Sequence, residues 1–277
     1  MCLALVALDA HPRYRLFIAA NRDEFHARAA EAAQWWPEDV LAGRDSVGGG
    51  TWFGVTRRGR WALVTNYREG VPRDPAAPSR GQLVRVALKD AAPPLACAAR
   101  LAPDGSRYHG YNLLIGDVLP HPRPSPRGRG ETRESLRDWG STAAYTSNRA
   151  SGALGLERGI HGLSNHLLET PWPKLLRAKA RLAAAMSERV DPIEASFELL
   201  ADRERAPAAS LPSTGVSPEW ERLLSSAFIV HREYGTRCST VLAIESSGCA
   251  RFIERSFDAM GQPKGETAFE FEIVPGP

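Results

Sequence analysis

A cysteine followed by an unbroken apolar run opens the chain, and this run constrains the fold more than any other segment. Behind Cys2, residues 3–8 are all apolar and show no alternation with polar residues. Such a run, ended by turn residues at 9–13, predicts a short strand that is covered on both faces. A strand of this kind requires layers on either side of it, so the sequence predicts layered packing from its first residues.

Cys2 itself supports two interpretations. Methionine aminopeptidase is expected to remove Met1 before so small a residue, which would leave Cys2 with a free α-amino group beside its thiol. An ordinary thiol is mostly protonated at neutral pH, and an α-amine with a pKa of about 8 is a suitable base for it. One residue would then supply both nucleophile and base. The alternative is a small apolar residue that starts a buried strand.

The remaining patterns indicate an α+β fold with mostly antiparallel strands. Strand patterns occupy both ends of the chain and helical patterns lie between them. The expected strands are residues 16–20, 51–56, 61–67, 111–116, 227–230, 240–244, 251–256 and 269–273. The expected helices begin near Ser79, whose capping box Gln82 completes, and near Leu95, Pro173, Asp191 and Ser217.

Length allows one large domain or two small ones, and charge argues against a dedicated nucleic-acid binder. The 277 residues can bury one large core, no internal repeat divides them, and the formal net charge is only +3. Many arginines lie in residues 120–140, a Pro-, Arg- and Gly-rich segment that predicts an exposed loop, with a basic recognition arm as its alternative use. No stretch approaches the roughly 18 apolar residues of a membrane span, and no leader peptide pattern is present, so we expect a cytoplasmic protein.

Motifs for metals and cofactors are missing from the sequence. None of the four cysteines forms a Cys-x-x-Cys pair, and the histidines have no ligand spacing. The run Gly48-Gly49-Gly50 lacks the Lys-Ser/Thr ending of a phosphate-binding loop. We therefore predict no metal and no required cofactor, and we expect Cys97 and Cys238 to be buried small apolar residues.

Polar clusters end several of the predicted strands. Asn21-Arg22-Asp23-Glu24 ends the strand that returns beside the first one, so a hairpin would bring this cluster close to Cys2. Arg22 or Asp23 could then bias the thiolate or hold the terminal ammonium, whereas the alternative is a solvated strand end or a helix cap.

Similar clusters recur further along the chain. Thr65-Asn66-Tyr67-Arg68 ends the next hairpin, and an Asn amide can donate to a developing oxyanion, although an Asx turn explains the residue equally well. Ser147-Asn148 and the segment 161–165 repeat this pattern. His161 is a candidate general base, but none is needed if the α-amine does that work.

Taken in order, these motifs resemble the NRDE-domain family, also called the transport and Golgi organisation protein 2 family. The resemblance covers nearly the whole chain and rests on Met1-Cys2-Leu3, Asn21-Arg22-Asp23-Glu24, Gly49-Gly50-Thr51-Trp52-Phe53-Gly54, Thr65-Asn66-Tyr67-Arg68, Ser79-Arg80-Gly81, Tyr111-Asn112-Leu113, Ser147-Asn148, Gly162-Leu163-Ser164-Asn165 and Thr240-Val241. It implies one N-terminal-nucleophile hydrolase-like domain over residues 1–277, a four-layer αββα sandwich of mostly antiparallel sheets.

The resemblance also implies roles for single residues. By similarity to cysteine amidases of that fold, Cys2 would be the nucleophile, Asp23 would orient the α-amine, and Asn66 and Asn165 would be oxyanion or amine partners. Arg237 would be the arginine near the nucleophile. The expected binding residues are Asn21, Arg22, Trp52, Tyr67, Arg68 and His161.

The sequence departs from the amidases at one position. Their arginine precedes the Asn of the first cluster, whereas here Ala20 precedes Asn21 and the arginine is Arg22. Two functions stay open on the resemblance: a cysteine amidohydrolase acting on small amides, and a carrier without catalytic activity that binds haem, a lipid or an acyl-CoA.

Overall fold

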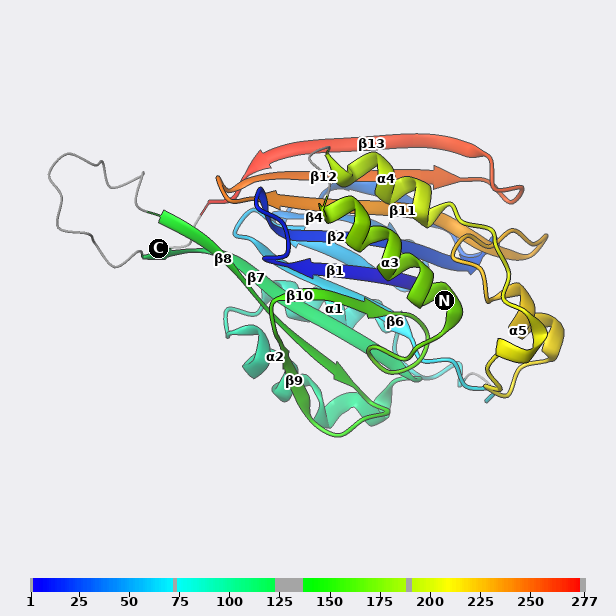
Figure 1. Cartoon of the computed structure of the whole chain (residues 1–277). Helices are drawn as coiled ribbons and strands as arrows, with labels where there is room; N and C mark the ends of the chain where they lie inside the picture. The colour runs from blue at the N-terminus through cyan, green and yellow to red at the C-terminus, as the bar shows by residue number, and fades with distance from the viewer. Residues whose placement is uncertain (1, 72–73, 123–136, 188–190, 275–277) are drawn as a thin grey trace, which may run out of the picture.

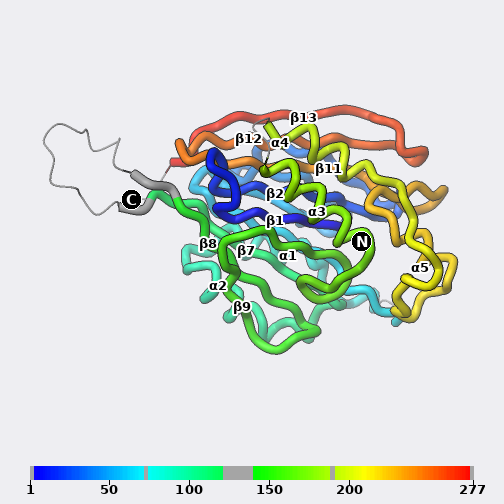
Figure 2. Tube along the Cα trace, in the orientation of Figure 1, coloured from blue at the N-terminus to red at the C-terminus, as the bar shows by residue number. Residues whose placement is uncertain are grey.

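Two antiparallel sheets lie face to face at the centre of the molecule, as Figures 1 and 2 show. The computed structural model describes residues 2–71, 74–122, 137–187 and 191–274. The first sheet has six strands in the order β10 (Gly159–Leu163), β1 (Cys2–Leu8), β2 (Tyr14–Phe25), β11 (Tyr234–Glu245), β12 (Cys249–Phe257) and β13 (Pro263–Glu272). The second has seven, in the order β3 (Ala30–Trp35), β4 (Val40–Asp45), β5 (Phe53–Thr56), β6 (Arg60–Asn66), β7 (Tyr111–Pro122), β8 (Arg137–Ser147) and β9 (Ala153–Leu156).

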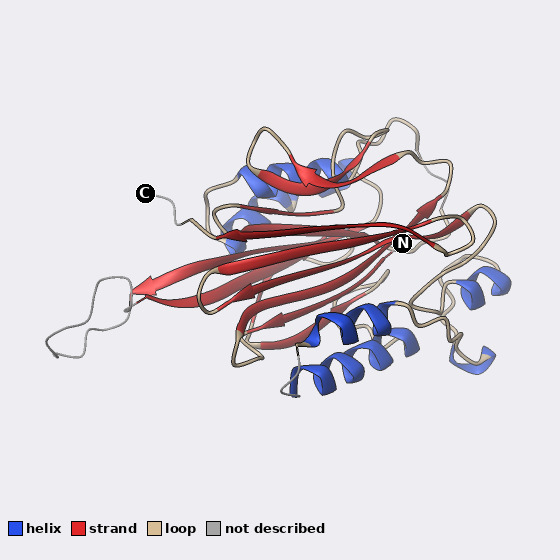
Figure 3. Cartoon of the chain, turned by 90° about the horizontal axis from the view of Figure 1, so that it is seen from above, coloured by secondary structure: helices blue, strands red, loops and turns tan. Residues whose placement is uncertain are grey.

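Helices cover the outer face of each sheet, which makes four layers in all (Figure 3). The helices α3 (Pro173–Ser187) and α4 (Pro192–Leu200) pack on the six-stranded sheet. The helices α1 (Gly81–Lys89) and α2 (Pro94–Leu101) pack on the seven-stranded sheet, and the short α5 (Pro218–Leu223) lies beyond the ends of the strands. The predicted αββα sandwich is thus confirmed.

Strand β1 is covered on both faces, as its sequence predicts. Leu3, Leu5 and Ala7 pack under α3 and α4, while Ala4 and Val6 point into the core between the sheets. All five are at most 2% exposed. An unbroken apolar run is what a strand needs when neither of its faces meets water.

Other sequence predictions are corrected by the structure. Strand β2 continues to Phe25, so the cluster at residues 21–24 lies within the strand rather than after it. Residues 227–230 form no strand, since only an isolated bridge joins Val230 to Gly235. The Ser79 capping box is not formed, because Gln82 Nε2 donates to the Gly48 carbonyl at 2.7 Å instead.

The segment at residues 120–140 is in part a hairpin rather than a loop. β7 extends to Pro122 and β8 begins at Arg137, and the two pair along this stretch. The loop predicted between them falls on residues 123–136, outside the described residues. The predicted helix starts at Asp191 and Ser217 are confirmed, and each side chain caps its helix by accepting a hydrogen bond from the first turn. No helix in the described part of the chain is both long enough and apolar enough to cross a bilayer.

Candidate active site

The candidate site begins at the first residue pair of the β1–β2 ladder. Cys2 pairs with Arg22 on β2, and Arg22 pairs in turn with Cys238 on β11. The hairpin thus brings the 21–24 cluster beside the start of the chain, as the sequence predicts. The backbone of Cys2 is described, whereas its side chain and the whole of Met1 lie outside the described part of the structure.

A polar cleft of about 600 Å³ opens at this end of the sheets. Arg22 and Asp23 of β2 line it on one side, and Asn66 at the end of β6 lines it on the other. The rest of its wall comes largely from the turn after β4 and from residues 74–82. Four of the predicted site residues therefore line one cavity, namely Arg22, Asp23, Trp52 and Asn66, and they come from three separate segments of the chain.

Asp23 is a buried carboxylate within this cleft wall. It is 2% exposed, and its Oδ1 accepts a hydrogen bond from Thr236 Oγ1 at 2.7 Å. Burial raises the pKa of Asp23, while the positive charge of Lys174, the hydrogen bond from Thr236 and the charge of Arg68 oppose that shift. These three described neighbours thus favour the ionised form of a carboxylate that is shielded from water.

Lys174 is a site residue that the sequence reasoning missed. Its side chain is 2% exposed, and Nζ donates to the Leu224 carbonyl at 3.0 Å. A signal was present in the sequence, because Lys174 shares the buried face of α3 with Ala178, Leu182 and Ala185 at helical spacing. A lysine at a position that periodicity assigns to the core requires a partner or a function.

Arg22 is buried between the two sheets and stacks on an indole ring. Its Cζ lies 4.2 Å from the centre of the Trp52 ring, and the residue is 6% exposed. Within the part of the chain that the structure describes, its side chain has no hydrogen bond and no ion pair. The ring of Trp52 lies over Gly43, where any Cβ would clash with it.

Asn21, one residue earlier, faces the helices rather than the cleft. Its Nδ2 donates to the carbonyls of Leu200 at 2.8 Å and Ala227 at 2.9 Å, and its Oδ1 accepts from Ser239 at 2.6 Å. Every polar atom of the amide is therefore used: Nδ2 joins β2 to the layer above it, and Oδ1 joins it to the neighbouring strand β11. The opposite orientation of neighbouring residues on a strand separates this structural residue from Arg22.

Asn165 lies behind Asn66. It is fully buried, its Nδ2 donates to the Asn66 carbonyl at 3.1 Å, and its own carbonyl accepts from the Arg68 amide at 2.7 Å. Asn66 itself is half-buried and lines the cleft. The geometry thus gives Asn165 the task of fixing the backbone at the end of β6.

Tyr67 and Arg68 follow Asn66 in the chain but line a second cavity rather than the cleft. The Tyr67 hydroxyl lies 2.7 Å from His166 Nε2. Arg68 is 5% exposed, stacks on Trp172 at 4.6 Å and forms an ion pair of 2.6 Å with Glu221.

A second cavity of about 300 Å³ adjoins this segment. Apolar and aromatic side chains supply much of its wall, and Asn66, Arg80 and His109 line both this cavity and the cleft. The apolar part of the wall consists of Phe25, Val71, Val216, Trp220, Leu224 and Tyr234.

Arg237 and His161 lie away from the cleft. Arg237 sits where the β2–β11 register shifts, and its NH1 donates to the carbonyls of Phe25 at 3.0 Å and His26 at 3.1 Å. His161 pairs with Val6, four residues along β1 from Cys2, and its Nε2 lies 2.8 Å from the Glu157 carbonyl. The structure does not bring His161 to the start of β1.

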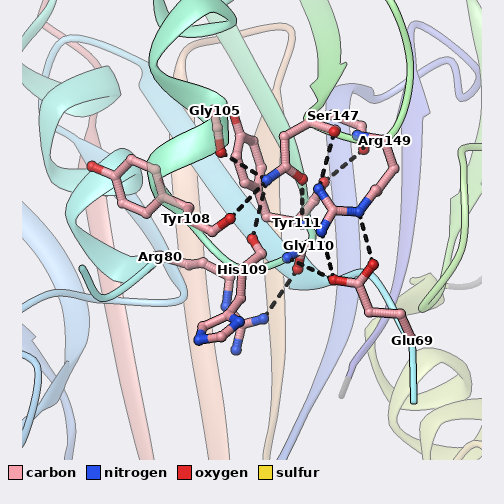
Figure 4. A network of polar contacts seen from close by, with 10 residues as sticks. Glu69, Arg80, Gly105, Tyr108, His109, Gly110, Tyr111, Ser147 and Arg149 are labelled. Atoms are coloured by element: carbon pink, nitrogen blue, oxygen red, sulfur yellow. Dashed lines mark hydrogen bonds and ion pairs between the residues drawn. The ribbon is translucent and has the colours of Figure 1, made fainter. Parts of the chain in front are cut away.

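The Ser147-Asn148 motif anchors the loop before β7 (Figure 4). Asn148 Nδ2 donates to the carbonyls of Gly105 at 2.8 Å and Tyr108 at 3.1 Å, while its Oδ1 accepts from the Tyr111 amide at 2.9 Å. The anchored loop carries His109 to the wall shared by the cleft and the second cavity. This asparagine therefore shapes the site without entering it.

A partly exposed ion pair between Arg149 and Glu69 adds a further contact to the same loop. Arg149 NH2 donates to Glu69 Oε1 at 2.7 Å, and the same oxygen accepts from the Gly110 amide at 3.2 Å (Figure 4). Arg80 donates to the Gly110 carbonyl at 3.1 Å. In the described residues, no three His, Cys, Asp or Glu side chains gather as a metal site, and Cys97 and Cys238 are buried thiols, as predicted.

Comparisons with known proteins give one consistent result at the sequence level. A family model described as Transport and Golgi organisation 2 matches residues 1–259. The chain is 33% identical to the Transport and Golgi organization protein 2 homolog of Bos taurus and 32% identical to that of Homo sapiens, and each match covers 99% of both chains. It is 26% identical to the Drosophila melanogaster Transport and Golgi organization protein 2, over 96% of this chain and 95% of that one.

Two solved structures are similar at a lower level. A Caenorhabditis elegans N-acylethanolamine-hydrolyzing acid amidase ortholog has a TM-score of 0.45 and 10% identity, and covers 89% of this chain and 93% of its own. A mutant conjugated bile acid hydrolase from Clostridium perfringens has a TM-score of 0.47 and 8% identity, over 98% of this chain and 92% of that one. Likeness at this level does not identify the chemistry.

Proposed function

Because the chain belongs to the Transport and Golgi organisation 2 family and opens a polar cleft at the start of its first strand, we propose that it is a cysteine amidohydrolase of the N-terminal-nucleophile type. The observation that carries the proposal is the register of β1. Cys2 pairs with Arg22 at the cleft, and the next residue of β2 is the buried carboxylate Asp23. A first residue beside an acidic group is the arrangement that an α-amine base requires.

The proposed reaction uses the α-amine that removal of Met1 would expose. The amine takes the proton of the Cys2 thiol, and the thiolate attacks the carbonyl carbon of a small amide. Asp23 holds the resulting ammonium, and the Asn66 amide donates to the oxyanion. The ammonium returns its proton to the leaving amine, and water then hydrolyses the thioester.

The charge of Asp23 is the part of this scheme that the protein must maintain. An ionised carboxylate is disfavoured by burial, and Lys174 and Thr236 act against that effect. Lys174 therefore has a place in the proposed reaction as a positioning residue that keeps Asp23 negative. Fully buried lysines are rare without such a task.

Turnover of a panel of small N-acyl p-nitroanilides tests the proposal. We expect Cys2→Ala to lower the rate by about 1,000-fold or more, as removal of a nucleophile does in other hydrolases. Cys249→Ala is the matched control, because Cys249 is a partly exposed thiol on β12 that lines none of the described cavities near the cleft. Undiminished hydrolysis by Cys2→Ala would reject the proposal.

A second candidate function is the binding and transfer of an apolar ligand such as haem or a lipid. The observation that favours it is the apolar cavity of about 300 Å³ beside the cleft, with Trp220 and Tyr234 in its wall. His109 lines both cavities and would be the ligand for a haem iron. A stoichiometric Soret shift that His109→Ala abolishes would support the haem form of this function, and an unchanged haem spectrum would reject it.

A further inference from the structure

A third cavity, of about 260 Å³, lies behind the stacked pair of Arg22 and Trp52. Of the described residues, only these two line both this cavity and the main cleft. The arginine and the indole ring thus form the partition between the two spaces. The remaining wall comes from β3, β11, β12 and β13, and it consists of Ala30, Glu31, Ala32, Arg237, Cys238, Glu254, Ser256, Phe257, Lys264, Gly265, Glu266 and Thr267.

Arg22 is the first reason to expect a ligand there. Its guanidinium carries five N–H donors, which make no hydrogen bond or ion pair with the described residues, although it stacks on the Trp52 ring and its charge acts on Glu254. A charged group that is 94% buried, given its 6% exposure, is costly unless something pairs with it. Its donors are therefore available to a molecule that enters either cavity.

Arg237 is the second reason. Burial lowers the pKa of Arg237, and the like charge of Arg22 lowers it further, so the two guanidiniums act on each other across the cavity wall. Arg237 Nε is buried without a hydrogen-bond partner among the described groups. Two neighbouring guanidiniums repel each other unless an anion lies between them.

The acidic residues of the wall do not cancel this charge. Glu266 is paired with Arg255 at 2.7 Å. Burial raises the pKa of Glu254, while the hydrogen bond from the Ala33 amide at 2.8 Å and the charge of Arg22 oppose that shift. Glu31 and Lys264 are exposed, so Glu254 is the one carboxylate among the described wall residues that faces the two arginines without an arginine partner of its own, and a surplus of positive charge remains.

We propose that this cavity binds a small organic anion. Its carboxylate or phosphate oxygens bridge Arg22 and Arg237, and its apolar body lies against Trp52 and Phe257. Guanidinium groups bind both kinds of oxyanion with two parallel hydrogen bonds, and stacking on an aromatic ring orients the arginine for this. A volume of about 260 Å³ suits a molecule the size of a single aromatic ring with a short acidic arm. The proposal does not depend on any turnover by Cys2.

Calorimetric titration of the full-length Cys2→Ala protein tests the proposal without interference from hydrolysis. The probes are phenylacetate, phenyl phosphate and the neutral phenylacetamide. We expect either or both anions to bind at least tenfold more tightly than the amide, and the stronger of the two identifies the oxyanion. Equal affinity for anions and amide would overturn the proposal.

Variants locate the binding. Arg22→Gln and Arg237→Gln are each expected to weaken anion binding at least tenfold, with folding checked by thermal unfolding. Arg232→Gln is the matched control, since Arg232 is an exposed arginine outside the cavity, with 83% of its side chain accessible, and should change nothing. Unchanged affinity in both cavity variants would overturn the proposal. Anion binding by the wild type that disappears in Cys2→Ala would do so as well, because it would make Cys2 part of the binding group.

Discussion

Two arginines in this protein are buried to nearly the same extent and each stacks on a tryptophan, but only one of them has a carboxylate partner among the described residues. Arg22 and Arg68 are 6% and 5% exposed, and their guanidiniums lie 4.2 and 4.6 Å from the ring centres of Trp52 and Trp172. Arg68 forms an ion pair of 2.6 Å with the buried carboxylate of Glu221. Arg22 has no ion pair among the described residues and lines two cavities instead. The same side chain thus serves structure in one place and is held ready for a ligand in the other.

The largest effect on the free energy of unfolding is expected at the ion pair of Arg68 and Glu221. Glu221→Gln should lower the free energy of unfolding by about 3–5 kcal/mol, because it leaves Arg68 buried without its counter-charge. Arg22→Gln should stay within about 1 kcal/mol of the wild type, since no carboxylate loses its partner. Urea unfolding measures both. Equal losses in the two variants would remove the distinction between the arginines, and Glu219→Gln, an exposed change on the same helix α5, controls for helix effects.

Asn21 sharpens the contrast between neighbours on β2. Asn21→Ala should lower the free energy of unfolding by about 2 kcal/mol, because the carbonyls of Leu200 and Ala227 and the hydroxyl of Ser239 lose their buried partner. Urea unfolding of Asn21→Ala and Arg22→Gln under the same conditions compares their free energies of unfolding. A variant as stable as the wild type would mean that the amide is not what joins β2 to the helical layer.

The stacking rings can be tested as a matched pair. Trp52→Phe and Trp172→Phe should each cost about 1 kcal/mol, since a phenyl ring attracts a guanidinium less strongly than an indole. Thermal unfolding compares them directly. If only Trp172→Phe is destabilising, Arg22 does not depend on its ring, and the partition between the two cavities is weaker than its geometry suggests.

The smallest effect is expected at the surface ion pair of Glu69 and Arg149. Hydrogen bonds from Arg149 hold the pKa of Glu69 below its usual value. A depressed acid pKa stabilises the fold above the unfolded value of 4.5, and this contribution is lost as the pH falls through the folded value. Glu69→Gln should therefore cost at most about 1 kcal/mol at pH 7 and nothing in strong acid. A cost that persists unchanged at pH 3 would show that charge is not its source.

The sequence predicts the central strands and the helices of this fold better than it predicts the edge strands of the two sheets. The apolar run of β1 and the capped helices follow from local patterns, because burial on both faces and capping each leave a mark within a few residues. The edge strands β3, β9 and β10 carry weak or mixed patterns and gain their pairing from neighbours far along the chain. Residues 227–230 have a strand-like composition, yet they lie against the helical layer instead of joining a sheet.

The site divides in the same way. Hairpin geometry predicts that Arg22 and Asp23 lie near the start of the chain, since the register of β1 and β2 is local. The burial of Lys174 near Asp23 and the cavity behind Trp52 are products of tertiary packing between α3, β2 and β13. The opposite uses of Asn21 and Arg22 follow from strand alternation, but only the structure shows which face carries the cleft.

Mass spectrometry of the intact protein, before and after treatment with a thiol-reactive acylating probe, tests the central claim most directly. The claim is that Cys2, freed of Met1, is the reactive nucleophile of the cleft. It predicts a mass without Met1 and one acyl adduct, which fragmentation maps to Cys2. Retention of Met1 in protein that hydrolyses amides, or an adduct on Cys97, Cys238 or Cys249 in place of Cys2, would contradict it.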